Sequence, residues 1–171
     1  MNRDLIISDA NILIDLANLN ILDAFTQLNF NCHTTDYVLA ELNNEQQTLI
    51  KQLELDGKMQ VISSDSQDIM GILQLVGKSS GLSVQDCSVW HFSKKINAVM
   101  QTGDRKLRKE AESDKITVRG ILFIFDELLR QELIDFQKAI HTITLLQQTN
   151  NRLPADEINK RIDEWGKGNL V

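Results

Sequence analysis

The chain has 171 residues, 42% of them hydrophobic, which is enough to build the core of one domain. Its formal net charge of −6 and pI near 5.0 argue against a protein that coats nucleic acid through overall positive charge, but they leave room for a local basic patch. The sequence has neither the features of a signal peptide nor an apolar run long enough to span a membrane, so we expect a soluble, cytoplasmic protein.

Short strands and helices alternate along the chain. In the first unit, a β-branched run at 5–7 ends at Ser8-Asp9, and Ile12, Leu13 and Leu16 then recur at helical spacing. The same reading predicts further strands at 30–33, 59–62, 96–100 and 116–119. It predicts helices at 21–28, 37–42, 45–55, 68–76, 82–95, 109–112, 121–130 and 135–148, with a last helix from Pro154 to near Trp165.

This alternation predicts an α/β protein with a central parallel sheet and helices on both faces, a three-layer α/β/α sandwich. No repeat, low-complexity stretch or linker divides the chain. We therefore expect one domain over residues 1–171, with residues 135–171 as a C-terminal helical extension packed on it.

Four acidic residues share one context in this fold. Asp9 and Asp104 end predicted strands, and Glu41 and Asp86 lie in the opening turns of helices that face the same edge of the sheet. The carboxyl ends of parallel strands are where ligands bind in open α/β sheets. Each acid also has a structural interpretation: Asp9 and Asp104 as helix caps, Asp86 as part of a capping box with Ser83, and Glu41 as a solvated helix residue.

The chemistry of clustered carboxylates favours a metal site. Carboxylates held close together repel each other, so such clusters usually persist because a cation occupies their centre. Oxygen ligands suit Mg²⁺ or Mn²⁺, and an ion held in this way is the usual apparatus for phosphodiester hydrolysis. If the four acids form one site, the sequence therefore favours Mg²⁺ or Mn²⁺ there and the hydrolysis of a phosphodiester.

Four stretches resemble, in order and context, the acidic motifs of PIN-domain nucleases, a family that includes the VapC-type toxins of bacterial toxin–antitoxin pairs. They are Ile7-Ser-Asp-Ala-Asn-Ile-Leu-Ile14, Val38-Leu-Ala-Glu-Leu42, Leu82-Ser-Val-Gln-Asp86 and Met100-Gln-Thr-Gly-Asp-Arg-Lys-Leu107. The helix at 120–133 and the Arg152-Leu-Pro154 segment also look like those of a prokaryotic PIN-related subgroup. The resemblance covers roughly residues 4 to 130.

The resemblance implies a metal-dependent ribonuclease with Asp9, Glu41, Asp86 and Asp104 as catalytic, metal-binding acids. By analogy, Asn11 and Thr102 would support the site. It also implies RNA as substrate, a homodimer, and a small antitoxin protein as partner if the chain is a toxin.

Basic residues gather near the predicted site in an otherwise acidic chain: Lys94, Lys95, Arg105, Lys106, Arg108, Lys109 and Arg119. Such a patch could hold RNA phosphates or an acidic segment of an antitoxin. It could also be a solvated helix surface, as charge runs usually are.

Other candidate ligands have structural interpretations. Trp90 and His91 follow Asp86 on one helix, and we expect them to be packing residues. His33 and His141 have no spacing typical of zinc, and we expect the two cysteines, Cys32 and Cys87, to be reduced, buried thiols.

Other functions are open at this stage. Aspartate-nucleophile phosphatases have a second acid two residues after the first, where this chain has Asn11, and receiver domains need paired acids where it has Ser8-Asp9. A catalytically silent PIN-like module that binds RNA or a partner stays as the alternative function.

Two sets of apolar residues favour a dimer, Ile69, Leu73 and Val76 in one set, and Phe136, Ile140, Ile143 and Leu146 in the other. The C-terminal set could instead complete the core of the monomer.

Overall fold

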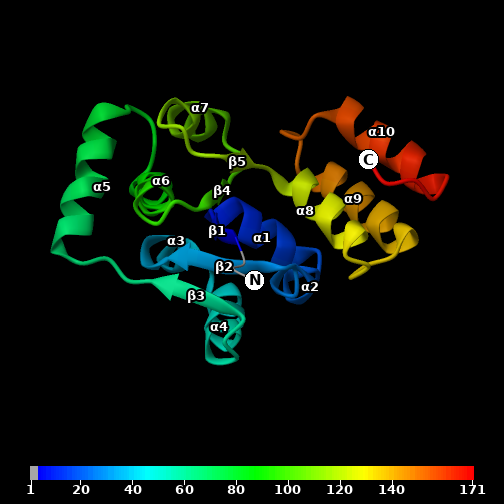
Figure 1. Cartoon of the computed structure of the whole chain (residues 1–171), viewed down its shortest axis with the longest axis horizontal. Coiled ribbons are helices and arrows are strands. Elements are labelled where there is room, and N and C mark those ends of the chain that lie inside the picture. The colour runs from blue at the N-terminus through cyan, green and yellow to red at the C-terminus, as the bar shows by residue number, and fades with distance from the viewer. Residues whose placement is uncertain (1–3) are drawn as a thin grey trace.

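Five parallel strands form a central sheet in the computed structural model, which describes residues 4–171 (Figure 1). In spatial order they run β3-β2-β1-β4-β5, and every neighbouring pair is parallel. β1 lies at the centre, and its Ile6 and Ile7 side chains are completely buried. The strands are β1 (Asp4–Ser8), β2 (Phe30–Thr35), β3 (Met59–Ile62), β4 (Val99–Gln101) and β5 (Val118–Arg119).

Helices cover both faces of this sheet. α6 packs against β1, β2 and β4, and α5 packs on the outside of α6. Figure 1 shows α5 and α6 on one side of the sheet, with α1 and α2 on the other. The predicted α/β sandwich with a parallel sheet is confirmed. The helices are α1 (Ala10–Asn18), α2 (Leu22–Thr26), α3 (Asp36–Glu41), α4 (Asn44–Leu55), α5 (Ser66–Lys78), α6 (Val84–Lys95), α7 (Arg105–Ser113), α8 (Ile121–Arg130), α9 (Phe136–Thr149) and α10 (Ala155–Gly166).

The strand order brings the ends of β1 and β4 together, although they are far apart in the sequence. Ser8 is the register partner of Gln101, and the Asp9 amide donates to the Gln101 carbonyl oxygen over 3.0 Å. Because all five strands run in one direction, their carboxyl ends share one edge of the sheet. The turns that follow β1 and β4 therefore lie side by side.

Two predicted boundaries around β4 were wrong. The strand was expected from residue 96, but Ile96 caps the end of α6, and Asn97 has a left-handed backbone with φ of 53°. The chain needs these residues to leave the helix, so β4 begins at Val99. The following helix begins at Arg105, earlier than expected, because the Asp104 side chain caps it.

The C-terminal helices complete the core of the monomer. α9 packs on both α8 and α10, and Ile143 and Leu146 of α9 are buried. Trp165 of α10 is also buried and lies 6.2 Å from Phe125 of α8, measured between ring centroids. Ile143 and Leu146 of the predicted dimer set therefore belong to the core of the monomer, whereas Phe136 and Ile140 are half-buried.

α5 differs in this respect, because Ile69, Met70 and Leu73 on its outer face are exposed. Its inner side chain Ile72 is completely buried. Cys32 and Cys87 are both buried, as expected. Within residues 4–171 there is no helix with both the length and the apolar character needed to cross a membrane.

Candidate active site

Three of the four predicted acids lie at the start of helices along the edge where the strands end. Asp9 follows β1 and caps α1, and Asp104 follows β4 and caps α7. Asp86 lies in the first turn of α6, the helix that packs across β1 and β4. The predicted caps and the predicted site residues are thus the same side chains.

Asp9 is the most buried of these acids, with 3% of its surface exposed. Its Oδ1 accepts a hydrogen bond from the Ile12 amide over 2.9 Å, which is the cap of α1. Its Oδ2 is buried and makes no hydrogen bond of ordinary geometry within residues 4–171, although the Thr102 side chain is close enough to the carboxyl group to lower its pKa. A buried polar atom without a partner is costly, so this oxygen has the capacity to accept one more bond.

The pKa of Asp9 is raised from 3.8 to about 7, first of all by burial. The negative charges of Asp86 and Asp104 act in the same direction, whereas the Thr102 side chain and the Ile12 amide act to lower the pKa. Asp86 and Asp104 therefore each lie within electrostatic reach of Asp9. Such a carboxylate is stabilised by an added positive charge.

Thr102 connects two of these acids. Its hydroxyl oxygen accepts a hydrogen bond from the Asp104 amide over 3.0 Å, and its side chain also lowers the pKa of Asp9. Asp104 in turn caps α7 by accepting from the Leu107 amide over 2.7 Å. Thr102 is completely buried, so it holds the turn between β4 and α7 in one conformation.

Asp86 forms the capping box that the sequence predicts. Its Oδ2 accepts from the amide of Ser83 over 2.9 Å and from the hydroxyl of Ser83 over 2.8 Å. The Ser83 hydroxyl oxygen accepts from the Asp86 amide in return. These bonds use one carboxyl oxygen and orient the other.

Glu41 has a different position from the other three acids. It is the last residue of the short helix α3, where the prediction placed it near the helix start, and its side chain is exposed. Asn11 is also exposed, and it is the second residue of α1, two positions after Asp9. Asp9 is thus buried and Asp86 and Asp104 are half-buried, whereas Glu41 is exposed at the end of α3.

The arrangement of donors limits how a metal ion could bind. Residues 4–171 contain no group of three or more His, Cys, Asp or Glu side chains that could hold a metal ion. Mg²⁺, however, is usually held by one or two carboxylates together with waters and substrate phosphates. The unpaired Oδ2 of Asp9 fits such a partial site, because an ion there would meet an oxygen that has no other partner.

Beneath the acids is a layer of buried polar side chains that the sequence reading missed. Ser8 donates to the Gln101 side-chain oxygen over 2.7 Å, and Thr34 donates to the Ser8 carbonyl oxygen over 3.0 Å. The hydroxyl of Thr35, at the end of β2, lies 2.7 Å from the hydroxyl of Ser88 on α6. All five are completely buried at the ends of β1, β2 and β4 or on α6. Polar residues at the end of apolar strands were the signal that could have revealed them.

The predicted basic residues separate into two groups. Lys94 and Lys95 lie in the last turn of α6, whereas Asp86 is in its first turn, about 12 Å away along the helix axis at 1.5 Å per residue. Lys94 pairs with Asp114 over 3.0 Å, and Lys95 pairs with Asp68 over 2.6 Å. These two lysines contribute to packing between helices and are not brought together with the acids.

The remaining basic residues belong to α7 and β5, next to Asp104. Arg105, Lys106 and Lys109 are exposed on α7, and Arg108 donates to the Val118 carbonyl oxygen over 3.2 Å. The Lys106 ammonium lies beside Gly81, 3.1 Å from where a Cβ would stand there. This group, unlike the lysines of α6, adjoins the candidate site.

Trp90 and His91 are packing residues, as expected. Trp90 is completely buried and donates to Asp114 over 3.0 Å. The His91 Nε2 lies 2.9 Å from Asp68, which links α6 to α5. His33 lies at 2.8 Å from the Asn31 carbonyl oxygen, a local contact within β2.

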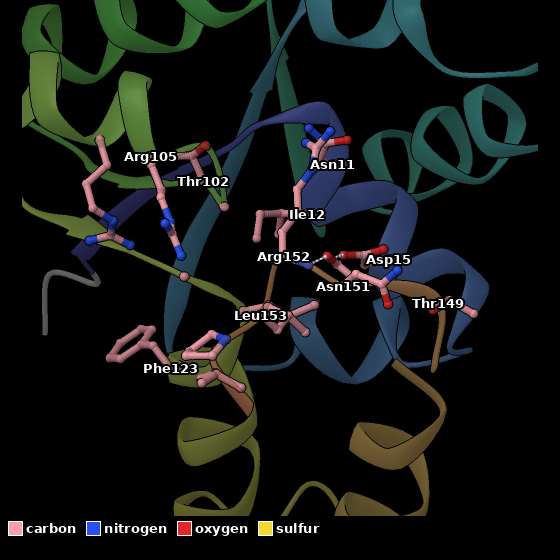
Figure 2. Close-up of a pocket in the computed structure, with 17 residues that line it drawn as sticks. Asn11, Ile12, Asp15, Thr102, Arg105, Phe123, Thr149, Asn151, Arg152 and Leu153 are labelled. Atoms are coloured by element: carbon pink, nitrogen blue, oxygen red, sulfur yellow. Dashed lines mark hydrogen bonds between the residues drawn. The ribbon is translucent and has the colours of Figure 1, made fainter. Parts of the chain in front are cut away.

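A pocket of about 730 Å³ opens beside the acids. Asn11 and Thr102 form part of its wall, and Figure 2 shows them together with Arg105 above Phe123 and Leu153. The loop between α9 and α10 closes the other side, so the C-terminal helices contribute to this edge of the sheet. No motif in the sequence predicted this pocket, because its residues come from four separate segments.

Comparison with protein families finds a match over residues 5–167 to the family model described as DUF3368: PIN domain. Comparison with curated proteins finds no match.

Among solved structures, this chain is similar to VapBC2 from Rickettsia felis bound to a DNA fragment from its promoter (15% identity, 68% of this chain and 98% of that chain covered, TM-score 0.48). It is also similar to PAE2754 from Pyrobaculum aerophilum (15% identity, 74% of this chain and 96% of that chain covered, TM-score 0.48). A third similar structure is VapBC-1 from nontypeable Haemophilus influenzae (16% identity, 68% of this chain and 97% of that chain covered, TM-score 0.47).

Proposed function

The chain belongs to the PIN-domain family, and from this premise we propose that it is a metal-dependent endoribonuclease with its site at Asp9, Asp86 and Asp104. The observation that carries the proposal is the Asp9 carboxylate, which is buried beside two other acids with one oxygen lacking a hydrogen-bond partner. A structural cap needs only one of those oxygens. The unused oxygen is most simply explained by a cation.

In this proposal Mg²⁺ or Mn²⁺ is held by Asp9 with Asp86 or Asp104. Glu41 is exposed at the end of α3, so its place in the ligand set rests on the family resemblance alone. The bound ion would supply positive charge to the phosphate and to the attacking water. Asn11 and Thr102 would support the acids without binding the ion strongly.

The protein's own contribution is to hold the acids in fixed positions. The Ile12 and Leu107 amides each bind one oxygen of Asp9 and Asp104, so each carboxylate keeps its other oxygen oriented. Hydrolysis joins the oxygen of water to phosphorus and breaks the bond from phosphorus to the leaving oxygen, which takes up a proton. The exposed bases of α7, Arg105, Lys106 and Lys109, would attract the RNA backbone.

The direct test is cleavage of RNA by the purified chain with Mg²⁺, with Mn²⁺ and with a chelator. We expect cleavage only with metal, and we expect Asp9→Asn to remove it. Asn is also a good helix cap, so this variant should stay folded. Asp135→Asn is the matched control, because Asp135 caps α9 in the same way, through the Lys138 amide. Full activity in Asp9→Asn would contradict the proposal.

A second candidate function is a PIN-like module that binds RNA or a protein without cutting. It is supported by the lack, in residues 4–171, of three or more side chains grouped to hold a metal ion. This module would bind RNA equally well in metal and in chelator, and it would show no cleavage under either condition.

We also propose that a small antitoxin protein binds this chain and that two copies form a dimer. The basic side chains of α7 could hold an acidic segment of the antitoxin. The exposed Ile69, Met70 and Leu73 of α5 could pair with the same residues of a second copy. A neighbouring reading frame for a small DNA-binding protein, copurified with this chain after coexpression, would test the first idea, and light scattering tests the second.

A further inference from the structure

The pocket beside the acids has a polar wall and an apolar wall. Its volume of about 730 Å³ lies in the range of pockets that hold small organic ligands. One end is formed by Asn11 and Thr102, the neighbours of Asp9 and Asp104. A ligand in this pocket would therefore extend directly from the position of the acids.

Within residues 4–171, three arginines and one carboxylate, Asp15, line the pocket, so positive charge dominates its polar wall. Arg105 and Arg152 line it from α7 and from the loop between α9 and α10, and their side chains make no hydrogen bond or ion pair within the described part of the chain. Arg108 is a third lining residue. Because guanidinium groups match the geometry of phosphate, two available arginines at one pocket suggest an anionic ligand.

The start of α8 strengthens this preference for an anion. Gly120 caps this helix without a side-chain hydrogen bond, so the first amides of α8 stay available at the pocket. The amino end of a helix carries partial positive charge and binds phosphate groups. Arg108 lies over the same point, 3.6 Å from where a Cβ of Gly120 would be.

The apolar wall comes from Ile121, Phe123 and Leu153. Phe123 is half-buried, and the Arg119 guanidinium lies 5.5 Å from its ring centroid. Aromatic and apolar side chains of this kind are the surfaces on which bases of single-stranded nucleic acids stack. An acidic peptide would satisfy the arginines but would not need this wall.

The loop that closes the pocket is held in place before any ligand binds. The Asn150 side-chain amide donates to Asp15 of α1 over 3.1 Å, and the Arg152 amide donates to the Asn150 side-chain oxygen over 3.1 Å (Figure 2). These bonds fix the loop that presents Arg152 and Leu153. A preformed site loses less entropy when it binds its ligand.

We propose that this pocket binds one nucleotide of a single-stranded RNA, adjacent to the phosphodiester that the acids cleave. Arg105, Arg152 and the start of α8 hold its phosphate, and its base packs on Phe123 and Leu153. This inference rests on the proposed ribonuclease function, and it makes the C-terminal helices part of substrate binding.

The test is binding of a fluorescently labelled single-stranded RNA of ten nucleotides to the full chain in chelator, where no cleavage is expected. We expect Arg105→Ala and Arg152→Ala each to weaken RNA binding about tenfold. Each should also reduce the slope of log affinity against log salt concentration by about one. Both side chains are exposed, so folding should be unaffected, which melting curves check. Arg130→Ala, at the far end of α8, is the matched control and should bind like the natural chain.

Binding unchanged within twofold in both arginine variants would overturn the inference. The inference would also be overturned if the two arginine substitutions weakened the binding of a labelled peptide of ten glutamates as much as, or more than, the binding of RNA. The pocket would then be a site for an acidic protein segment. The result does not depend on catalysis: arginine-dependent RNA binding by a chain that never cleaves RNA would support the pocket and contradict the nuclease proposal.

Discussion

Two buried aspartates, Asp9 and Asp68, each take part in capping a helix, but their pKa values are shifted in opposite directions. Each is 3% exposed, and each belongs to the cap of a helix, α1 for Asp9 and α5 for Asp68. Burial acts to raise the pKa of both. For Asp9, burial prevails and the pKa is about 7, whereas for Asp68 hydrogen bonds from Lys95 and His91 outweigh it and the pKa is about 2.

The difference lies in the neighbours. Asp68 has a lysine at 2.6 Å and a histidine at 2.9 Å, so its charge is already balanced and it joins α5 to α6. Asp9 has two further acids near it and an oxygen with no partner. A balanced buried carboxylate contributes to stability, and an unbalanced one is a cost that a functional site accepts.

The largest effect should be on catalysis. We expect Asp9→Asn and Asp104→Asn to lower RNA cleavage at least ~100-fold, because each removes a proposed metal ligand. Asp68→Asn should retain activity near that of the natural chain when assayed below its melting temperature. Initial rates with a labelled RNA measure this, and equal losses in all three variants would remove the distinction between the two aspartates.

The free energy of unfolding should change in opposite directions in Asp9→Asn and in Asp68→Asn. In chelator, the folded pKa of Asp9 lies above its unfolded value, so its ionisation destabilises the fold increasingly as pH rises from 3.8 to about 7. Asp9→Asn should remove up to about 4 kcal/mol of this cost at pH 8. At pH 5, the gain in unfolding free energy of Asp9→Asn over the natural chain should be smaller by roughly 3 kcal/mol. Urea unfolding at both pH values decides it, and a loss of stability at pH 8 would make Asp9 a purely structural cap.

A metal ion should reduce that cost in the natural chain. At a Mn²⁺ concentration about 100 times its dissociation constant, binding to the folded state should add about 2.7 kcal/mol. Asp9→Asn should show little of this gain, and Asp135→Asn all of it. Melting curves with increasing Mn²⁺ give the result, and an equal gain in Asp9→Asn would place the ion elsewhere.

Asp68→Asn should destabilise the chain by at most about 2 kcal/mol at pH 7, because it leaves Lys95 and His91 without their partner. The folded pKa of Asp68 is below 3.8, so its contribution is complete above that pH and disappears as pH falls through about 2. The difference from the natural chain should therefore shrink towards pH 2. A pH-independent loss would assign the effect to the capping box.

The smallest effect concerns assembly. If α5 forms the dimer contact, light scattering at micromolar concentration should give twice 19.5 kDa for the natural chain. Met70→Asp with Leu73→Asp should give one copy, with little change in its own stability because both side chains are exposed. A mass of one copy for the natural chain would remove the dimer.

Much of the local structure could be predicted from sequence. The strand at 59–62, the helix at 121–130, the Ser83–Asp86 capping box and the caps at Asp9 and Asp104 all appear where expected. These features depend on side chains within four residues of each other. The β4 boundary failed because the apolar residues Ile96 and Ala98 suit either a helix end or a strand.

The sequence by itself determined the α/β class and the placement of acids at strand-to-helix turns, because hydrophobic period and capping chemistry are local. Only the tertiary structure decided which of these turns are neighbours. The strand order puts Asp9 beside Asp104, whereas the short length of α3 leaves Glu41 exposed at its end.

The direction and length of α6 likewise separate Lys94 and Lys95 from Asp86, although the three are close in the sequence. The packing of α9 and α10 brings Arg152 to the pocket from far along the chain. Contacts of this kind follow from how distant elements pack, and no spacing within one segment encodes them.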